Sequence, residues 1–399
     1  EHKVGLLSTV SLKPEPIPLD MKIIMIGEPW IYSMLSTMDT DFKKLFKIKA
    51  EFDWEMRLDG DTVGKLCRLI CSIARDNSLM DFDRDAVREV IKKAIILSGN
   101  RKKVSTQFGA LKQLLLESSA VVEINGGEMV SAEDVSRAWE EMKTRVSLYQ
   151  DKVKEMFADS TLLVQTEGEL IGEINGLTVV QTEDISFGIP VKITAKVGPG
   201  NSGIVDIQKE SELSGNIHDK AGLTIQGYMN SKYAREFPLS LNGSISFEQV
   251  YSMVEGDSAS VAETVAFLSA IAEAPIKQSI AVTGSINQSG RVQPVGGVQF
   301  KVEGFYELCK LKGLNGKQGV VIPDTNFDNL VLPDEIVLAI KNGRFNIWTV
   351  ETVDEAIELL TGLKAGQPDG DGKYPEGTFN NLVLQRLERF YEISMQEKK

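Results

Sequence analysis

The chain has 399 residues, 42% of them hydrophobic, and its 44 Lys+Arg against 57 Asp+Glu leave a formal net charge of −13 at pH 7. This length predicts more than one domain, with enough apolar side chains for about two or three cores. The acidic excess argues against nucleic acid as a partner, because a phosphate backbone is bound by clustered cationic side chains.

The cysteines and histidines exclude several kinds of site. Cys67, Cys71 and Cys309 lie in apolar helical patterns, and His2 and His218 are far apart. This argues against a disulfide framework, a structural zinc site and a histidine-based catalytic triad. No apolar run approaches the length of a membrane span and no signal peptide opens the sequence, so we expect no membrane partner and a cytoplasmic location.

The first elements of the chain, over residues 13–38, do not make up a complete domain. Residues 13–18 are too rich in proline for a helix or a central strand, and we interpret them as a connector. Residues 21–27 predict a short buried strand, and a helix follows from Trp30 to about Met38. Because one β-α unit cannot form a sheet, either this is the edge of a small sheet or the chain begins inside a domain whose earlier part precedes it.

One segment partly matches the phosphate-binding loop motif of ATPases. It is Gly60-Asp-Thr-Val-Gly-Lys-Leu66. Only three residues separate the glycines instead of four, Leu66 takes the place of the magnesium-binding hydroxyl, and no strand precedes the segment. We therefore interpret it as the start of a helix and predict no cofactor site in this chain.

Two further regions differ in their periodicity. Residues 62–157 are helical in pattern, whereas from about residue 160 short alternating segments with glycine turns predict strands. We expect helices over 63–75, 83–99, 108–122 and 131–157, the last opened by the capping pattern Ser131-Ala-Glu-Asp134. We expect strands over 176–181, 190–197, 203–207, 221–228, 278–284, 319–323 and 346–350.

The end of the chain alternates strands with helices over 332–341 and 353–361, then continues through a polar loop to a charged helix over 382–397. The predicted fold class is α+β. The predicted domains are 1–61, 62–157, 158–364 and 365–399.

Ser258 lies directly before a predicted helix over 261–274 and shares its apolar face with Val261 and Val265. A buried hydroxyl needs a partner, and the free N–H groups of the first helical turn could stabilise an oxyanion beside it. The alternative is an ordinary N-cap, since Gly-Asp-Ser is common before a helix.

Lys301 shares an apolar stripe with Val298, Val302 and Phe305 on a predicted helix over 298–310. A snorkelling side chain or a buried ion pair are the structural alternatives. The functional interpretation is that burial lowers its pKa from about 10.4 towards neutrality, so that the amine can take a proton from a serine. The sequence thus predicts a Ser258–Lys301 catalytic dyad, with no metal site.

Four motifs in order resemble the proteolytic domain of Lon proteases, in particular the LonB-like branch. They are Val254-Glu-Gly-Asp-Ser-Ala-Ser260, Val282-Thr-Gly-Ser-Ile286, Gly290-Arg-Val-Gln-Pro-Val-Gly-Gly-Val-Gln-Phe-Lys301 and Gln318-Gly-Val-Val-Ile-Pro323. The resemblance implies that Ser258 is the nucleophile, Lys301 the general base and Thr283 a group that orients the lysine. In this branch an acid precedes the serine; Asp257 could serve the chemistry or only complement the helix N-terminus.

Residues 14–27 and 46–52 resemble the late half of the AAA+ module of LonB-like proteins, and 62–157 resemble its helical lid. This implies that a nucleotide-binding half precedes residue 1, and that ATP and Mg would be cofactors only there. Lys47 or Lys49 could be a trans-acting cation or part of a solvated charge cluster. Gln107 lies near the place where the lid usually offers an arginine, which is a departure from the family.

The function that the resemblance implies is a serine endopeptidase that degrades unfolded or damaged polypeptides as a homo-oligomer, a hexameric ring. Residues 221–228 would lie along its substrate cleft. The alternative is a catalytically silent Lon-like assembly or substrate-holding module.

Overall fold

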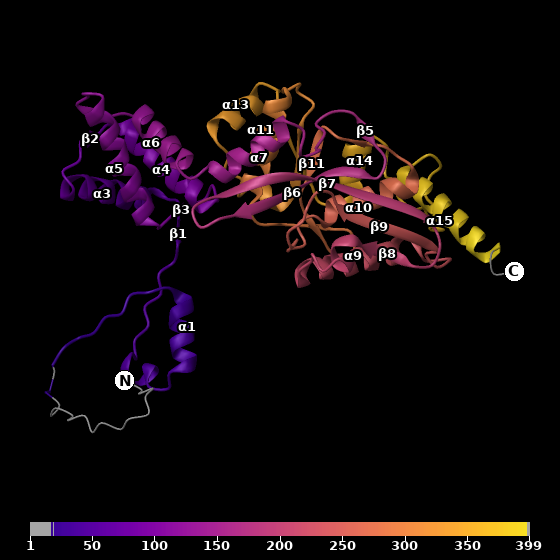
Figure 1. Ribbon diagram of the computed structural model, residues 1–399, viewed down its shortest axis with the longest axis horizontal. Coiled ribbons are helices and arrows are strands. Elements are labelled where there is room, and N and C mark those ends of the chain that lie inside the picture. The colour runs from indigo at the N-terminus through magenta and orange to yellow at the C-terminus, as the bar shows by residue number, and fades with distance from the viewer. Residues whose placement is uncertain (1–16, 19, 397–399) are drawn as a thin grey trace. The chain divides into compact units, whose positions relative to one another are not determined.

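The computed structural model describes residues 17–18 and 20–396, and the chain divides into two compact units, residues 1–53 and 54–399 (Figure 1). The described part of the first unit holds helix α1 (Pro29–Met38) and the short helix α2 (Phe42–Leu45). Proline at the first helical position suits α1, because that position needs no N–H.

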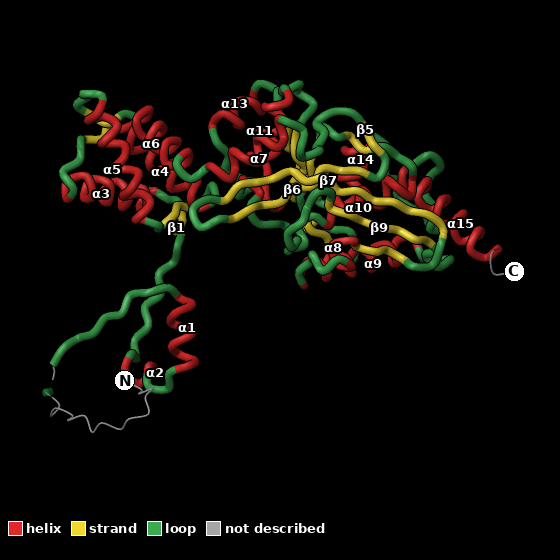
Figure 2. The backbone as a smooth tube through the Cα atoms, viewed as in Figure 1, coloured by secondary structure: helices red, strands yellow, loops and turns green. Residues whose placement is uncertain are grey.

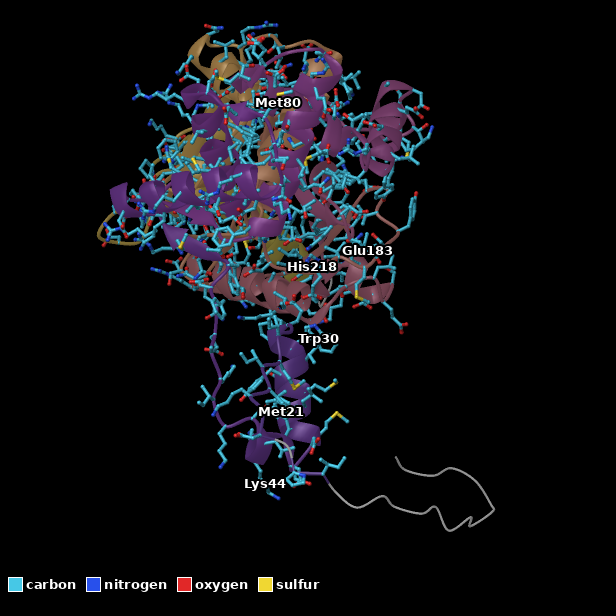
Figure 3. All side chains as sticks on the ribbon, turned by 90° about the vertical axis from the view of Figure 1, so that its left-hand side faces the viewer. Met21, Trp30, Lys44, Met80, Glu183 and His218 are labelled. Carbon is cyan, nitrogen blue, oxygen red and sulfur yellow. The ribbon has the colours of Figure 1, made fainter. Side chains whose placement is uncertain are left out.

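The strand predicted over residues 21–27 is wrong, since this segment has no regular structure. Ile26 is 97% exposed, and Met21 and Trp30, which Figure 3 labels, are 59% and 64% exposed. A strand exists only when a neighbour accepts its backbone hydrogen bonds, and the described residues of this unit provide none.

The second unit begins with a helical subdomain. Its helices are α3 (Gly60–Asp76), α4 (Arg84–Ser98), α5 (Phe108–Ile124), α6 (Ala132–Thr144) and α7 (Leu148–Ala158). Two small strand pairs complete it: β1 (Glu55–Arg57) with β3 (Lys103–Ser105), and β2 (Asp81–Phe82) with β4 (Met129–Val130). The phosphate-loop-like sequence is the first turn of α3, where Asp59 accepts the N–H of Thr62 as an ordinary N-cap.

The long helix predicted over residues 131–157 is divided into α6 and α7. Its start is as expected, because Ser131 and Asp134 form a capping box. The break falls at Ser147, whose hydroxyl lies 3.1 Å from the Thr144 carbonyl and 2.7 Å from an Asp151 carboxylate oxygen. Such local side-chain hydrogen bonds compete with a continuous helical ladder.

A mixed seven-stranded sheet with the strand order β15-β14-β11-β6-β7-β9-β8 forms the centre of the rest of the second unit (Figure 2). The strands are β6 (Glu173–Gln181), β7 (Ser186–Pro199), β8 (Gly203–Asp206), β9 (Leu241–Phe247), β11 (Ile280–Val282), β14 (Gly319–Pro323) and β15 (Asn346–Val350). Strands β6, β11, β14 and β15 run parallel, whereas β7 is antiparallel to both of its neighbours.

Helices cover both faces of this sheet. The core with α10 (Ser260–Ala272) includes Val321 of β14, whereas the core with α11 (Val298–Lys312) includes the adjacent Val320 and Ile322. Because successive side chains of a strand point to opposite faces, α10 and α11 lie on opposite sides of the sheet.

The other helices are α8 (Ile207–Glu210), α9 (Asn216–Tyr233), α12 (Asp324–Phe327), α13 (Asp334–Lys341), α14 (Val353–Thr361) and α15 (Phe379–Gln396). Two small antiparallel pairs, β5 (Glu169–Leu170) with β10 (Ile276–Lys277) and β12 (Ser285–Ile286) with β13 (Val292–Gln293), flank it.

Two further elements differ from the sequence prediction. The strand expected over 221–228 is part of α9, where Ala221, Ile225 and Tyr228 are buried at helical spacing. The sequence prediction places the charged terminal helix beyond the proteolytic domain, whereas α15 buries Phe379 and Val383 in the same core as α10.

Candidate active site

Ser258 lies in the turn just before α10. In space this turn contacts Thr283 and Gly284, the two residues that follow strand β11. Its backbone carbonyl accepts hydrogen bonds from the Gly284 N–H at 2.8 Å and from the Thr283 hydroxyl at 3.2 Å. The N-cap residue of α10 is Ala259. Ser258 is therefore not an ordinary helix N-cap, which was the alternative to a catalytic role. Its hydroxyl is instead 2.8 Å from the Lys301 amine.

Lys301 projects from the first turn of α11 and is only 3% exposed. Its Nζ lies 2.8 Å from Ser258 Oγ and 3.0 Å from Thr283 Oγ1. This excludes a snorkelling side chain, whose ammonium group would reach water. Within the described part of the chain this amine contacts two hydroxyl groups and forms no ion pair with a carboxylate, so a buried salt bridge does not explain it either.

The environment of Lys301 favours the neutral amine. Burial lowers its pKa to about 8, while the nearby Asp257 carboxylate acts in the opposite direction. A hydroxyl at 2.8 Å from such an amine can donate its proton to it, which is the geometry required of a nucleophile and its base. The arrangement can therefore generate an alkoxide at Ser258.

The position of α11 depends on two glycines that face each other. A Cβ on Gly304 would lie 2.2 Å from the Gly188 carbonyl oxygen of β7, and a Cβ on Gly188 would lie 2.1 Å from the Phe300 carbonyl oxygen. The helix backbone thus packs directly on the strand backbone, which only glycine permits. This close approach sets the depth at which Lys301 enters the site.

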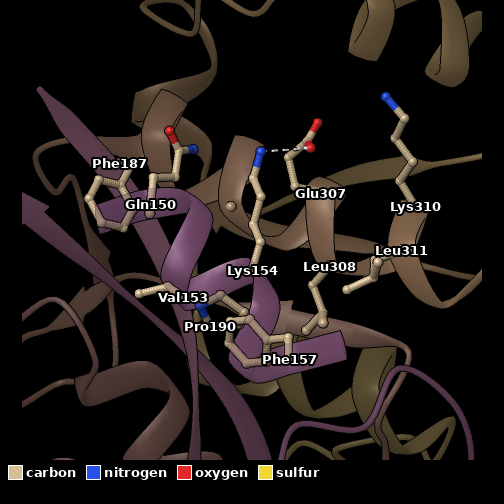
Figure 4. Close-up of a pocket in the computed structure, with 12 residues that line it drawn as sticks. Gln150, Val153, Lys154, Phe157, Phe187, Pro190, Glu307, Leu308, Lys310 and Leu311 are labelled. Atoms are coloured by element: carbon tan, nitrogen blue, oxygen red, sulfur yellow. Dashed lines mark ion pairs between the residues drawn. The ribbon is translucent and has the colours of Figure 1, made fainter. Parts of the chain in front are cut away.

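A pocket of about 240 Å³ lies on the outer side of α11, between α7 and β7 (Figure 4). Its apolar lining includes Val153, Phe187 and Leu308, and an ion pair of Lys154 with Glu307 at 3.3 Å borders it. Neither Ser258 nor Lys301 lines this pocket, so the pocket is separate from the Ser258–Lys301 site.

The remaining candidate residues lie in different places. Asp257 directly precedes the serine, and its backbone carbonyl accepts the Ser260 N–H at 3.1 Å. Gln107 precedes helix α5 of the helical subdomain, where its N–H donates to the Ser105 hydroxyl. Lys49 belongs to the first unit, where it pairs with Glu51 and lies over the Tyr32 ring. Lys47 lies nearby in the sequence, and its role stays a prediction.

Sequence reasoning gave no role to three polar residues that lie close together, the buried His218 and Glu263 and the partly buried Asp206. His218 is 1% exposed, and its Nε2 lies 2.8 Å from Asp206 Oδ2 and 3.8 Å from Glu263 Oε1. Its spacing to Ala221 and Ile225 would have placed it on a buried face if the segment had been recognised as a helix. In the described residues no group of His, Cys, Asp and Glu is arranged to hold a metal ion. None of the helices there is long and apolar enough to span a membrane.

Comparisons with known proteins find matches to three separate parts of the chain. Residues 1–53 match the LonB-like AAA domain, 81–145 match the lid domain of the archaeal LonB AAA+ ATPase, and 252–362 match the Lon protease (S16) C-terminal proteolytic domain. Ser258, Thr283 and Lys301 all fall within the last match.

Curated relatives extend the similarity over most of the chain. A putative Lon protease homolog of Escherichia coli is 34% identical over 386 residues, which is 96% of this chain and 63% of that protein. One of Haemophilus influenzae is 33% identical over 77% of this chain and 51% of its own length. An archaeal Lon protease of Archaeoglobus fulgidus is 30% identical over 74% of this chain and 45% of its own length.

Fold and matches together define a partial AAA segment and a helical lid followed by a Lon-type α/β proteolytic domain. The chain belongs to the Lon protease family. It spans about half to two thirds of the length of these relatives.

Proposed function

We propose that this chain is a serine endopeptidase that uses a Ser258–Lys301 dyad. The observation that carries the proposal is the 2.8 Å contact between a serine hydroxyl and a buried lysine amine that has no carboxylate partner among the described residues, inside the proteolytic domain. Neutral Lys301 takes the hydroxyl proton while Oγ bonds to the peptide carbonyl carbon, giving a tetrahedral intermediate. As the C–N bond breaks, the ammonium returns the proton to the leaving amine, and an acyl-enzyme remains.

Hydrolysis of the acyl-enzyme repeats the same steps with water. Lys301 accepts a proton from the water, which attacks the ester carbon, and the ammonium then reprotonates Ser258 as the acid leaves. Thr283 holds the amine in place through its hydroxyl at 3.0 Å, and the same hydroxyl binds the Ser258 carbonyl. Thr283 thereby couples the position of the base to that of the nucleophile.

The substrates we propose are unfolded or damaged polypeptides, cleaved by a homo-oligomeric ring that the family resemblance suggests is hexameric. The similarity of this chain to Lon proteases supports polypeptide substrates. The peptidase chemistry itself requires no metal or nucleotide from this chain.

The test is active-site trapping with a peptide boronate, together with hydrolysis of a fluorogenic peptide. We expect boronate adduct formation at Ser258 and loss of hydrolysis in Ser258→Ala. Lys301→Arg should also abolish hydrolysis, because a guanidinium stays charged and cannot accept a proton. The matched control is Lys310→Arg on the exposed end of the same helix, which should retain activity.

Labelling at a different serine, or full turnover by Lys301→Arg, would contradict the dyad. A protein that binds unfolded polypeptide but forms no adduct and cleaves nothing would instead be the silent substrate-holding module.

A further inference from the structure

The turn that carries the nucleophile is tied to the chain after β11 by backbone hydrogen bonds. The Gly284 N–H donates to the Ser258 carbonyl at 2.8 Å, and the Val261 N–H donates to the Gly284 carbonyl at 3.1 Å. These two contacts place the first turn of α10 beside the end of β11. They do not involve the peptide between Asp257 and Ser258, which carries the N–H of the nucleophile itself.

Ser260, the first residue of α10, holds this peptide. Its side chain is buried, with 1% of the residue exposed, and its hydroxyl donates to the Asp257 carbonyl at 2.9 Å. The Ser260 N–H donates to the same carbonyl at 3.1 Å. Because a trans peptide is planar, the Asp257 C=O and the Ser258 N–H point in opposite directions. Two donors that fix the carbonyl therefore also fix the direction of the Ser258 N–H.

The same hydroxyl accepts a hydrogen bond from a second segment. The Ile286 N–H, in β12, donates to Ser260 Oγ at 3.0 Å. Ile286 pairs with Val292 of β13, and residues 294–297 connect β13 to α11, which carries Lys301. A serine can serve both groups, because a hydroxyl has one proton to donate and lone pairs to accept. Ser260 therefore bridges the turn of the nucleophile and the hairpin that leads to the base.

The Ile286 N–H depends on this bridge because it is shielded from water. Ile286 is 4% exposed. A buried N–H without an acceptor is unfavourable, so without the Ser260 hydroxyl either β12 or the nucleophile turn must shift until the N–H finds another partner. Either shift changes the relation between the two segments that the hydroxyl joins.

We propose that Ser260 is a positioning residue, whose hydroxyl fixes the Asp257–Ser258 peptide against β12 and so keeps the Ser258 hydroxyl in contact with Lys301. The inference rests on the proposed Ser258–Lys301 chemistry. Nucleophile and base belong to helices on opposite faces of the sheet, so their 2.8 Å contact requires links between the two segments. The Ser260 hydroxyl is such a link, two residues from the nucleophile.

The decisive variant is Ser260→Ala, which removes the hydroxyl and keeps the helix. We expect kcat to fall about 10- to 100-fold with little change in KM, because the nucleophile is misplaced while the substrate contacts remain. The rate of boronate trapping at Ser258 should fall with kcat. Ser260→Thr keeps a hydroxyl on the same carbon atom and should restore most of both rates.

Ser269 provides a matched control in the same helix. It is fully buried, and its hydroxyl donates to the Ala274 carbonyl and accepts the Gly172 N–H at 3.0 Å. It thus bridges two backbone groups as Ser260 does, but near the end of α10 that is remote from the nucleophile. Ser269→Ala should lower the thermal stability about as much as Ser260→Ala and leave kcat nearly unchanged.

Unchanged kcat in Ser260→Ala, or an equal loss of kcat in Ser269→Ala, would overturn the inference, and so would a Ser260→Thr protein as slow as Ser260→Ala. Hydrogen exchange of the Ile286 amide is a readout independent of proteolysis. Exchange should be faster in Ser260→Ala and unchanged in Ser269→Ala, whereas equal exchange in all three proteins refutes the bridge. If the unaltered protein neither hydrolyses peptide nor forms a boronate adduct, the dyad proposal fails separately, and the exchange rates still decide whether Ser260 ties the turn to β12.

Discussion

A lysine can act as a base near neutral pH only where its surroundings destabilise the charged ammonium form. Lys301 meets this condition because it is 3% exposed and has two hydroxyl groups as hydrogen-bond partners. With a pKa of about 8, about a tenth of such amines are neutral at pH 7, compared with about one in a few thousand for a free lysine. The opposing influence is Asp257, whose carboxylate favours the ammonium.

Asp257→Asn therefore tests the charge balance of the site. Removing this carboxylate should lower the pKa of Lys301 further, so the acidic limb of the pH–rate profile should move to lower pH. The neutral base would then be present at lower pH, and activity near pH 7 should rise if Asp257 has no other role. Complete loss of activity with a normal thermal melt would instead assign Asp257 a direct part in the reaction.

At the scale of secondary structure, the site depends on two helices from opposite faces of one sheet. Ser258 precedes α10 and Lys301 lies in the first turn of α11, and the two residues meet beyond the end of β11, where Thr283 follows the strand. The backbone contact of α11 with β7 at Gly188 and Gly304 determines how closely the helix approaches. Any side chain there must push α11, and Lys301 with it, away from the sheet.

Gly304→Ala should therefore damage both stability and activity. The new Cβ would lie 2.2 Å from the Gly188 carbonyl, and overpacking of this kind costs about 1–3 kcal/mol of unfolding free energy. Denaturant unfolding and the rate of boronate trapping measure the two effects. Gly222→Ala in α9 is the matched control: nothing lies within 4 Å of its Cβ, so higher helix propensity should leave the protein as stable or slightly more so. An unaffected Gly304→Ala protein would show that α11 can shift freely.

At the scale of the whole molecule, polar contacts join the helical subdomain to the proteolytic domain. The Arg101 guanidinium donates to the Phe327 carbonyl at 2.7 Å, Lys102 pairs with Asp328 at 2.8 Å, and Lys92 pairs with Asp334. These groups are exposed, so each contact contributes little by itself. The first turn of α3, which approximates a phosphate loop in sequence, is capped by Asp59 and presents a carboxylate where a phosphate would need N–H donors.

We therefore expect this chain to cleave unfolded polypeptide at a rate that ATP and Mg²⁺ do not change. A loosely folded chain reaches an open site through its own fluctuations, whereas a stable domain must be unfolded against about 5–15 kcal/mol. Comparing casein with a stable folded domain, each with and without Mg-ATP, measures both expectations. Stimulation by ATP in the purified chain would show that nucleotide binds in residues 1–399 after all.

The sequence alone determined the residues of the candidate site and most of the elements that carry them. Ser258 and Lys301 were found because a serine before an apolar helix and a lysine within an apolar stripe are local patterns, readable from side-chain spacing. Helix α11 and strands β6, β7 and β14 lie where their periodicity predicted them. Whether the dyad is catalytic stays a proposal.

Only the tertiary structure decided the rest, because it depends on contacts between distant segments. Residues 21–27 have the composition of a strand but no partner among the described residues of their unit, and residues 221–228 form a helix because their apolar side chains face the core. His218 of α9 lies beside Asp206 of β8 and Glu263 of α10, and no local pattern relates these three residues. A pKa is likewise a property of burial and neighbours, so Lys301 becomes a base only when the folded chain surrounds it.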